Sequence, residues 1–332
     1  MCIRDRFNDL LEKNIIRLAP MAGVSNAPFR TICLDNGSGF VTTEEIDSIS
    51  LVYNKSDRTK LITAFSEYEN PIAMQLLGCD SESLTESSKI LQDLGASIID
   101  INMGCPVPKI TKKGKGAALM KDIVGTAKLI NSIRNATKIP LTVKIRSGWD
   151  ENNINAVEFS KMLESEGVDG ITVHPRSRSQ RYEGNSKWSI IKQVVESVEI
   201  PVTGNGDVKS YDDAKRMIEF TKCKSVMIGR GAIGNPWVFN NSLEKLSYEE
   251  KDLYKKKTII NHLQQIKNYF PKKNLDMQIK KNLSYYAKGF YNSREIRQKI
   301  FRSSDSIENV IELFFKLFDR NVEKNKLEKI SV

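Results

Sequence analysis

Eight short apolar runs recur through the first 231 residues, and they constrain the fold more than any other feature of the sequence. Continuous apolar runs of this length are typical of strands that are buried on both faces, as in parallel sheets. Most of them end in Gly, Pro or a polar residue. They span residues 15–21, 40–44, 71–78, 97–104, 141–148, 170–175, 200–207 and 225–231.

Longer amphipathic segments separate most of these runs. After Asp80, for example, Leu84, Leu91 and Leu94 share one helical face, and Gly95 ends the helix. Strands that alternate with helices in this way indicate parallel βαβ units. Eight such units are the number needed to close a (β/α)8 TIM barrel of ordinary size.

We therefore expect a TIM barrel over residues 15–240, preceded by a loose leader at residues 1–14. An open, doubly wound sheet is the alternative arrangement of the same units. The absence of an early GxGxxG motif favours the barrel.

The pattern changes after Trp237, and no strand-like run follows Leu246. Residues 261–270 and 277–290 have helical periodicity. We therefore expect a second, all-helical domain over residues 241–332. Its clearest apolar helix face consists of Ile307, Val310, Ile311, Phe314 and Phe318.

The net charge of +10 is concentrated in this helical region. Residues 241–332 carry 20 Lys and Arg against 12 Asp and Glu, whereas the preceding 240 residues carry 31 against 29. A basic module of this kind is typical of proteins that bind nucleic acid or an anionic surface. A solvated, lysine-rich surface without a partner is the alternative.

Several classes of protein are not expected. No apolar run approaches the 18 residues of a membrane span, and the N-terminus lacks the apolar core of a secretory signal. No two of the five cysteines form a CxxC pair, and the chain has only two histidines, so we expect no metal site. We expect a cytoplasmic protein with free thiols, and a monomer.

Residues 99–122 carry the clearest sign of chemistry. A strand-like segment breaks into Asn102, Gly104, Cys105 and Pro106. A thiol just past a strand, at the carboxyl edge where barrel enzymes place their active sites, is a candidate catalytic group. The loop behind it contains four lysines, which suit a polyanionic substrate but are also consistent with a solvated loop: Lys109, Lys112, Lys113 and Lys115.

Polar residues end most of the other predicted strands. Loops after the last two strands of a barrel commonly bind phosphate. Asn205, Gly206 and Asp207 follow the seventh run, and Gly229 and Arg230 follow the eighth, which predicts a phosphate-bearing cofactor. The remaining candidates at this edge are Pro20, Met21, Ala22, Gln75, Lys144, Arg146 and His174.

Some of these residues have structural alternatives. Lys144 could pair with a carboxylate such as Asp100 or Glu45, and His174 could be a hydrogen-bonded core histidine. His262 is expected on the surface of the helical domain. Three cysteines, Cys33, Cys79 and Cys223, are expected to be small buried hydrophobic residues.

Seven segments, in order along the chain, resemble the flavin-dependent tRNA-dihydrouridine synthases. Among them are APMAGVSNAPFR, INMGCPVPKITKKGKGAALM, VHPRSRSQRYEG and IGRGAIGNPWVF. Together they cover almost the whole expected barrel, and the basic helical domain fits the same family. They span residues 19–30, 73–78, 101–120, 143–150, 173–184, 201–208 and 228–239.

The resemblance implies reduction of a tRNA D-loop uridine, with bound FMN, NADPH as reductant, and tRNA held by the helical domain. Hydride passes to C6 of the uracil, and Cys105 protonates C5. Asn102, Arg146 and Tyr182 would contact the uracil. The residues that would hold the FMN are Pro20, Met21, Ala22, Gln75, Lys144, His174, Asn205, Gly206, Asp207, Gly229 and Arg230.

The chain departs from the family pattern at two positions. Pro175 stands where Gly usually follows the histidine, which stiffens the loop beside His174, and Cys79 stands where Ser is expected. Two other functions compete with the main one. An FMN-dependent dehydrogenase of a small pyrimidine needs no basic helical domain. A non-catalytic RNA-binding protein does not account for Cys105 beside a flavin set.

Overall fold

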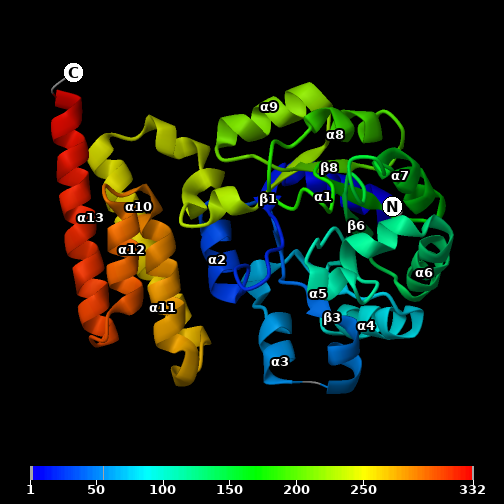
Figure 1. The fold of residues 1–332 in the computed structure, drawn as a ribbon, viewed down its shortest axis with the longest axis horizontal. Helices are drawn as coiled ribbons and strands as arrows, with labels where there is room; N and C mark the ends of the chain where they lie inside the picture. Colours follow the sequence, from blue (N-terminus) through cyan, green and yellow to red (C-terminus); the bar gives the residue numbers. More distant parts are fainter. Residues whose placement is uncertain (1–2, 55, 331–332) are drawn as a thin grey trace. The chain divides into compact units, whose positions relative to one another are not determined.

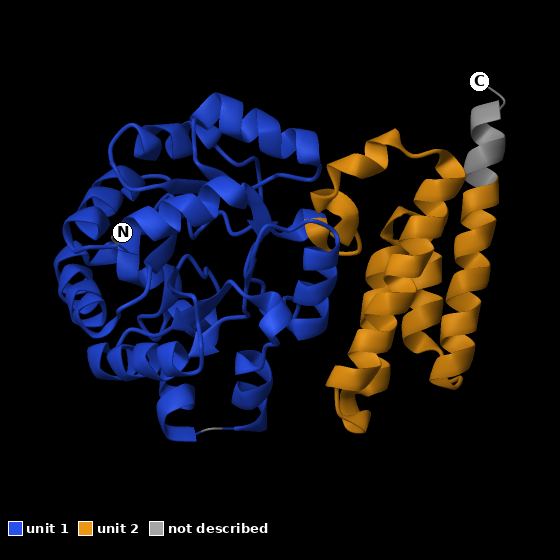
Figure 2. Ribbon diagram, turned by 180° about the vertical axis from the view of Figure 1, so that it is seen from behind, with its two compact units in different colours: residues 1–231 blue, residues 232–332 orange. Residues whose placement is uncertain are grey.

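The structure is a computed structural model that describes residues 3–54 and 56–330. Cys2, one of the five cysteines, lies outside the described residues. The chain divides into two compact units, residues 1–231 and 232–332 (Figure 2). The boundary expected after residue 240 thus falls inside the second unit.

Eight parallel strands form the predicted (β/α)8 barrel, one for each apolar run. Neighbouring strands follow the order β1, β9, β8, β7, β6, β5, β4, β2, and a short additional strand, β3 (Ile46–Asp47), pairs with β4. The barrel strands are β1 (Ile16–Leu18), β2 (Val41–Thr42), β4 (Ile72–Leu77), β5 (Ile98–Met103), β6 (Leu141–Arg146), β7 (Gly170–His174), β8 (Val202–Asn205) and β9 (Ser225–Ile228).

Two hydrogen bonds join β1 to the residues directly before β2, the last strand in this order. The N–H of Gly39 donates to the carbonyl of Ile16 (2.9 Å), and the N–H of Leu18 donates to the Ser38 hydroxyl (3.1 Å). An added Cβ at Gly39 would lie 2.5 Å from the side chain of Asn14, so this close approach requires glycine. The barrel is therefore nearly closed between β1 and β2.

Helices lie around the strands (Figure 1). As expected, α4 begins after Asp80, whose carboxylate caps the N–H of Ser83 (2.7 Å), and ends before Gly95, at φ +101°. Leu94 is half exposed, since it caps the helix and does not continue its buried face. The helices of this unit are α1 (Ile3–Lys13), α2 (Ala27–Asp35), α3 (Asp57–Thr63), α4 (Ser81–Asp93), α5 (Pro108–Thr111), α6 (Ile123–Ala136), α7 (Ala156–Ser165), α8 (Trp188–Val195) and α9 (Tyr211–Thr221).

The expectation of a loose leader is wrong for the residues that α1 contains. Phe7 and Leu11, four residues apart on one helix face, are each 1% exposed. They pack against Phe40, Ala73 and Ile98, which lie at or near the amino ends of strands. α1 therefore covers the end of the barrel opposite the expected active site.

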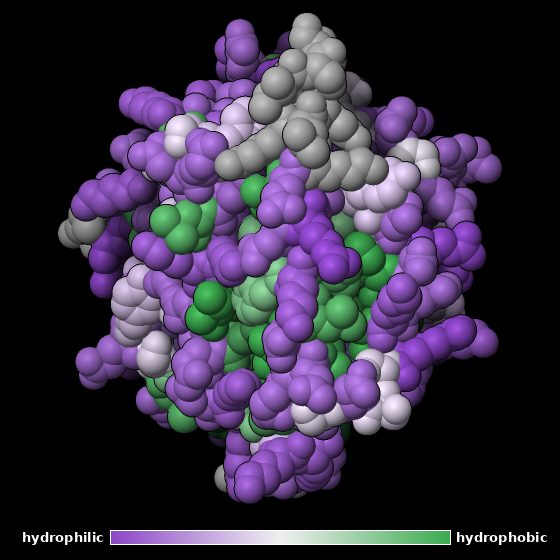
Figure 3. Space-filling model, turned by 90° about the vertical axis from the view of Figure 1, so that its left-hand side faces the viewer, coloured by the Kyte–Doolittle hydropathy of each residue, from purple (hydrophilic) through white to green (hydrophobic). Residues whose placement is uncertain are grey.

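The second unit is all-helical, as predicted, and the apolar face of α13 lies in its core with Ile259, Leu263 and Leu283. His262 is also buried and hydrogen-bonds to Tyr286 (2.7 Å), so the expected surface position is wrong. On the side of Figure 1 where these helices lie, hydrophilic side chains cover most of the surface (Figure 3). The helices are α10 (Tyr248–Tyr269), α11 (Lys272–Tyr286), α12 (Ser293–Arg302) and α13 (Ile307–Ile330).

None of the helices within residues 3–54 and 56–330 is long and apolar enough to cross a membrane.

A buried ion pair joins α2 to the segment that precedes β4. Arg30 and Glu69 have side chains that are 0% and 1% exposed, and the Arg30 Nε donates to the Glu69 carboxylate. The Arg30 guanidinium also donates to the carbonyls of Ser25 (3.0 Å) and Ala64 (2.9 Å). The carbonyls accept hydrogen bonds from the guanidinium, but only Glu69 supplies the negative charge that balances the buried cation.

Replacing Glu69 with Ala should lower the free energy of unfolding by about 3–5 kcal/mol, because it leaves the buried Arg30 cation without its counter-charge. Chemical denaturation followed by circular dichroism measures this change. Glu67→Ala is the matched control, since Glu67 lies on the same short helix and is exposed. An equal, small effect of both variants would contradict the assigned role of the pair.

Candidate active site

A continuous chain of hydrogen-bonded side chains from β4, β5 and β6 leads from inside the barrel to its carboxyl edge. Asp100 is 2% exposed and accepts from Gln75 Nε2 and from Thr142 Oγ1, at 2.6 Å each. The Oε1 atom of Gln75 in turn accepts from Asn102 Nδ2 (2.9 Å). These side chains can meet because residues 100 and 102 lie on the same side of β5 and Asp100 is in register with Gln75 and Thr142.

Asn102 extends the chain to the candidate catalytic thiol. Its amide nitrogen also donates to Glu45 (3.0 Å), and its oxygen accepts the N–H groups of Gly104 (3.1 Å) and Cys105 (2.9 Å). Both amide hydrogens and both oxygen lone pairs are thereby used. Asn102 thus positions the loop that carries Cys105, and contact with a uracil requires it to exchange one partner.

The Cys105 thiol is held in its protonated form. Burial, and then the Glu45 carboxylate, raise the pKa of Cys105 to about 11, although the N–H of Val107 and the cation of Arg146 act in the opposite direction. The Cys105 thiol and the Glu45 carboxyl group are close enough for each to shift the pKa of the other. Cys105 is partly exposed, so a protonated sulfur faces the edge where a substrate would bind.

Lys144 and His174 meet at the end of β8. The Nζ of Lys144 donates to Asn205 Oδ1 (3.0 Å), and Nδ1 of His174 lies 3.2 Å from the carbonyl of Asn205. Among the described residues Lys144 forms no ion pair, so pairing with Asp100 or Glu45 is not what the structure shows. Asn205 Nδ2 donates to the carbonyl of Met227 (2.9 Å), which anchors this group to β9.

Burial sets the charges of these two groups. Burial and the neighbouring Arg146 lower the pKa of Lys144 to about 8, so the ammonium is mostly protonated at pH 7. Burial, followed by Lys144 and Arg146, also lowers the pKa of His174 far below its ordinary value. Neutral His174 donates from Nδ1 to the Asn205 carbonyl and keeps Nε2 as an acceptor. Pro175 thus leaves His174 hydrogen-bonded at the end of its strand.

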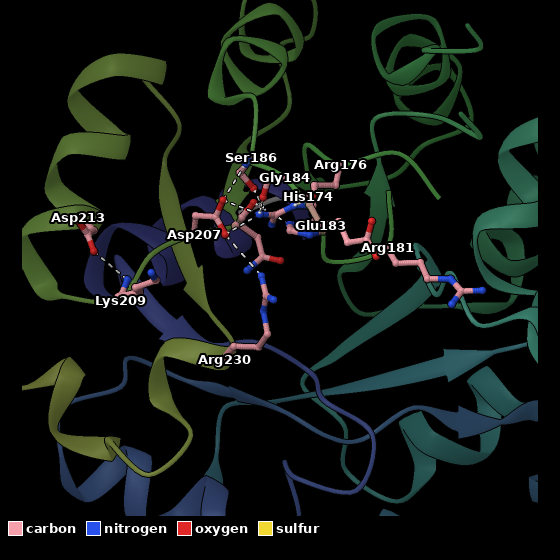
Figure 4. A network of polar contacts seen from close by, with 12 residues as sticks. His174, Arg176, Arg181, Glu183, Gly184, Ser186, Asp207, Lys209, Asp213 and Arg230 are labelled. Carbon is pink, nitrogen blue, oxygen red and sulfur yellow. Dashed lines mark hydrogen bonds and ion pairs between the residues drawn. The ribbon is translucent and has the colours of Figure 1, made fainter. Parts of the chain in front are cut away.

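Asp207 is the centre of a polar network that fixes the loops after β7 and β8 (Figure 4). Arg176 is 2% exposed and donates to both Asp207 oxygens (2.8 and 2.7 Å), to the carbonyls of Glu183 (3.1 Å) and Gly184 (2.6 Å), and to the Ser186 hydroxyl (3.2 Å). Burial raises the pKa of Asp207, but the bond from Arg176 and the Ser186 N–H outweigh it, so the net pKa is lowered.

The Asp207 carboxylate therefore accepts hydrogen bonds from the protein itself, whereas the Arg230 guanidinium remains accessible to a ligand. Arg230 makes a long contact with Asp207 (3.5 Å), and its side chain is 51% exposed. An added Cβ at the neighbouring Gly229 would meet only ordinary contacts at 3.6 Å. An added Cβ at Gly206, at φ +125°, would instead lie 2.2 Å from the Ser186 hydroxyl, so this turn requires glycine.

Arg146 and Arg230 both approach the ring of Tyr182. Their guanidinium carbons lie 5.7 and 5.0 Å from its centroid, and Tyr182 is 55% exposed. Arg146 also donates to the carbonyls of Gly104 (2.6 Å), Ser177 (3.0 Å) and Arg181 (2.8 Å). Arg146 thus joins the Cys105 loop to the loop that presents an exposed aromatic ring at the barrel mouth.

The other predicted residues divide into exposed and internal groups. Pro20 and Met21 are partly exposed and Ala22 is exposed, in the loop after β1. Lys109, Lys112 and Lys113 are exposed, whereas Lys115 is buried and paired with Asp47. Cys33 and Cys223 are buried as expected, but Cys79 is exposed and donates to the carbonyl of Lys113 (3.2 Å), so its expected burial is wrong.

Sequence reasoning assigned no role to two residues of this site. Glu45 was considered only as a partner of Lys144, and Arg176 was quoted only within a motif. The signal for Glu45 is a pair of acidic residues directly after a strand-like run. Arg176 has no comparable local signal, because its partners lie 7 to 31 residues away. Within the described residues, no cluster of three His, Cys, Asp or Glu side chains could hold a metal ion.

Comparison with known proteins finds relatives over nearly the whole chain. The family described as Dihydrouridine synthase (Dus) matches residues 17–322. The tRNA-dihydrouridine synthase B of Pasteurella multocida is 35% identical over 320 residues, which cover 94% of this chain and 96% of the relative. The probable tRNA-dihydrouridine synthase of Rickettsia bellii is 35% identical over 318 residues, which cover 93% and 97%.

Solved structures are similar in fold. The 2-naphthoyl-CoA reductase structure aligns with a TM-score of 0.54 and 10% identity, over 71% of this chain and 51% of that protein. The histamine dehydrogenase of Rhizobium sp. 4-9 aligns with a TM-score of 0.52 and 13% identity, over 70% and 45%. The chain thus spans about half the length of these proteins, and at this identity the likeness supports the barrel fold alone.

Replacing Arg176 with Met should loosen the loop at residues 183–186 without unfolding the barrel. The side chain supplies charged hydrogen bonds worth about 1.5–3 kcal/mol each, and about 1.4 kcal/mol corresponds to a factor of ten. Backbone amides of residues 183–186 should therefore exchange with deuterium at least about tenfold faster. Hydrogen exchange resolved by mass spectrometry measures this rate.

Arg181→Met is the matched control, because the Arg181 side chain is exposed and points away from Asp207 (Figure 4). It should leave exchange at residues 183–186 unchanged. Unaltered exchange in Arg176→Met as well would show that Arg176 does not hold the loop.

Proposed function

The chain belongs to the dihydrouridine synthase family, and we propose that it reduces a D-loop uridine of tRNA to dihydrouridine. The observation that carries the proposal is the Cys105 thiol, which is kept protonated at the carboxyl edge of the barrel near the cation of Arg146. The names of the relatives support the substrate. NADPH as the reductant follows from the family resemblance, and the monomeric state and cytoplasmic location expected from the sequence are also part of the proposal.

The residues present fit FMN. The accessible Arg230 guanidinium, with the open backbone at Gly229 beside it, suits the phosphate. Lys144 is a cation that can stabilise negative charge on a reduced ring, and neutral His174 offers an acceptor nitrogen. The side chains of Gln75, Asn205 and Asp207 are bound within the protein, so they would shape this site through the positions they fix. Bound FMN would supply the hydride that reaches C6 of the uracil.

The protein's own part in the reaction is to deliver a proton. When C6 gains hydride, negative charge develops on C5 and on the C4 carbonyl of the base. Cys105 can then donate its S–H proton to C5 as a general acid. A thiol whose pKa is raised to about 11 is fully protonated at neutral pH and therefore ready to donate. Reaching the base requires that it leave its stack in the folded tRNA.

The helical unit supplies cations for the tRNA backbone. Lys288, Arg294 and Arg297 are exposed, whereas Lys280 donates to the carbonyl of Ser303 (2.8 Å) and Lys281 lies over the ring of Tyr285. Phosphate contacts of this kind position a nucleic acid without reading its sequence. The three exposed cations are thus the candidates for tRNA contact.

Cys105→Ala should form dihydrouridine at least about 100-fold more slowly, the lower end of the contribution of a positioned general acid. It should retain FMN and be reduced by NADPH, because the thiol is not among the candidate flavin ligands. Nucleoside mass spectrometry of unmodified tRNA incubated with enzyme and NADPH measures the product, and absorbance measures the flavin.

Cys79→Ala is the matched control, since Cys79 is an exposed thiol outside the hydrogen-bonded chain. Near-normal dihydrouridine formation by Cys105→Ala would remove Cys105 from the mechanism. If the wild-type protein reduces a free pyrimidine and leaves tRNA unmodified, the proposed substrate is wrong.

Reversing the charges of Lys288, Arg294 and Arg297 to Glu should weaken tRNA binding and flatten its dependence on salt. Each lost phosphate contact lowers the slope of log affinity against log salt by about 0.7–0.9. We therefore expect a decrease of about 2–3 in this slope if all three residues contact phosphates. Filter binding over a salt series measures both quantities.

Reversing Lys161, Lys192 and Lys215 is the matched control, because these exposed lysines lie on α7, α8 and α9 and give the same change in net charge. An identical effect of the two sets would assign the loss to net charge. An unchanged slope in the helical-unit variant would place the RNA contacts on the barrel, with Lys109, Lys112 and Lys113 as the next candidates.

A further inference from the structure

The carboxylate of Glu45 lies near Cys105, and proton donation by the thiol alone does not require a carboxylate there. It follows Glu44 directly, and the two carboxylates have different partners. Glu44 accepts the N–H of Gly23 in the loop after β1. Glu45 accepts the amide N–H of Asn102 (3.0 Å), whose oxygen accepts the N–H of Cys105 (2.9 Å), and its carboxylate raises the pKa of the Cys105 thiol. Its side chain thus reaches the reactive sulfur from the segment between β2 and β3.

Each turnover of the proposed reaction leaves Cys105 as a thiolate. A partly buried thiolate beside the carboxylate of Glu45 is a repulsive arrangement, and it must regain a proton before the next turnover. A carboxylic acid is a much stronger acid than a thiol, so proton transfer from Glu45 to the thiolate is favourable. Glu45 is also partly exposed, and water can therefore reach it.

We propose that Glu45 relays protons from solvent to Cys105, an inference that rests on the proposed function. Glu45 carboxylate takes a proton from water or a buffer acid. The resulting carboxylic acid gives that proton to the Cys105 thiolate, which restores the thiol and the carboxylate. No electrons move in either step, and the net change is the transfer of one proton from solvent to sulfur.

The surrounding groups favour proton uptake by Glu45. Burial, then the neighbouring carboxylates of Glu44 and Asp47, raise its pKa, whereas Arg58 on α3 and the Cys105 thiol lower it. The thiol faces Arg146 on β6 in addition to Glu45. Asn102 holds Glu45 and the N–H of Cys105 at the same time, so the two acid groups stay close to one another.

The test uses Glu45→Gln in the full-length protein purified with its flavin. Glutamine keeps an oxygen that can accept the Asn102 amide and removes the ionisable proton. Glu82→Gln, an exposed residue on α4, is the matched control. Two measurements separate a relay from a residue that only supports the loop.

The first measurement is the rate of Cys105 alkylation by iodoacetamide against pH, followed on the Cys105 peptide by mass spectrometry without tRNA. Without the carboxylate, the thiolate should form at lower pH. The pH midpoint of alkylation should therefore fall by about one unit or more, because a nearby charge shifts a pKa on this scale. An unchanged midpoint would show that Glu45 does not contact the thiol in solution and would overturn the proposal.

The second measurement is tRNA reduction over repeated turnovers. Glu45→Gln should be at least about tenfold slower, less than the full contribution of a positioned proton donor because water still reaches the sulfur. Its rate should rise with the concentration of a small buffer acid such as imidazolium, whereas wild-type and Glu82→Gln rates should not. The relay would be overturned if Glu45→Gln reduced tRNA at the wild-type rate. It would also be overturned if the variant were slow and the buffer acid did not restore its rate.

The two proposals fail in different ways. If the wild-type protein leaves tRNA uridine unreduced, the proposed function fails and the relay that rests on it fails with it. If the wild type reduces tRNA and Glu45→Gln does so equally well, only the relay fails.

Discussion

The register between β4, β5 and β6 is the constraint on which the active edge depends. It places Gln75, Asp100 and Thr142 side by side, so the buried Asp100 carboxylate finds two donors. A buried acid without such partners is strongly destabilising. Because Gln75 is fixed by Asp100, it can fix Asn102, and Asn102 in turn fixes Glu45 and the Cys105 loop. A shift of one residue in this register would turn these side chains to the other face of the sheet.

Burial at this edge also decides which groups carry charge. It lowers the pKa of Lys144 and His174 and raises that of Cys105, which leaves a cation, a neutral imidazole and a protonated thiol near one another at pH 7. Parallel strands direct their carboxyl ends to the same side of a barrel, so these groups gather there although they are far apart in sequence. The chemistry of the site is therefore a consequence of strand direction and desolvation together.

Local patterns predicted most of the architecture. All eight apolar runs became barrel strands, and the apolar face that includes Phe314 lies in the helical core. The errors concern residues whose burial depends on partners distant in sequence. Phe7 is buried against residues near the amino ends of strands, and His262 against Tyr286. Cys79 is exposed, and its thiol donates to the carbonyl of Lys113, 34 residues away. No pattern within a short window contains those partners.

The sequence by itself determined the barrel, the helical unit, the family and the position of Cys105 at a strand end, because hydrophobic periodicity and strand-end motifs are properties of short segments. Only the tertiary structure decided which candidates are free to act. It bound the side chains of Asn102, Asn205 and Asp207 within the protein, left Arg230 half exposed, and brought Glu45 to the Cys105 thiol across a separation of 60 residues. The physical reason is that hydrogen bonding and desolvation depend on which atoms meet in space.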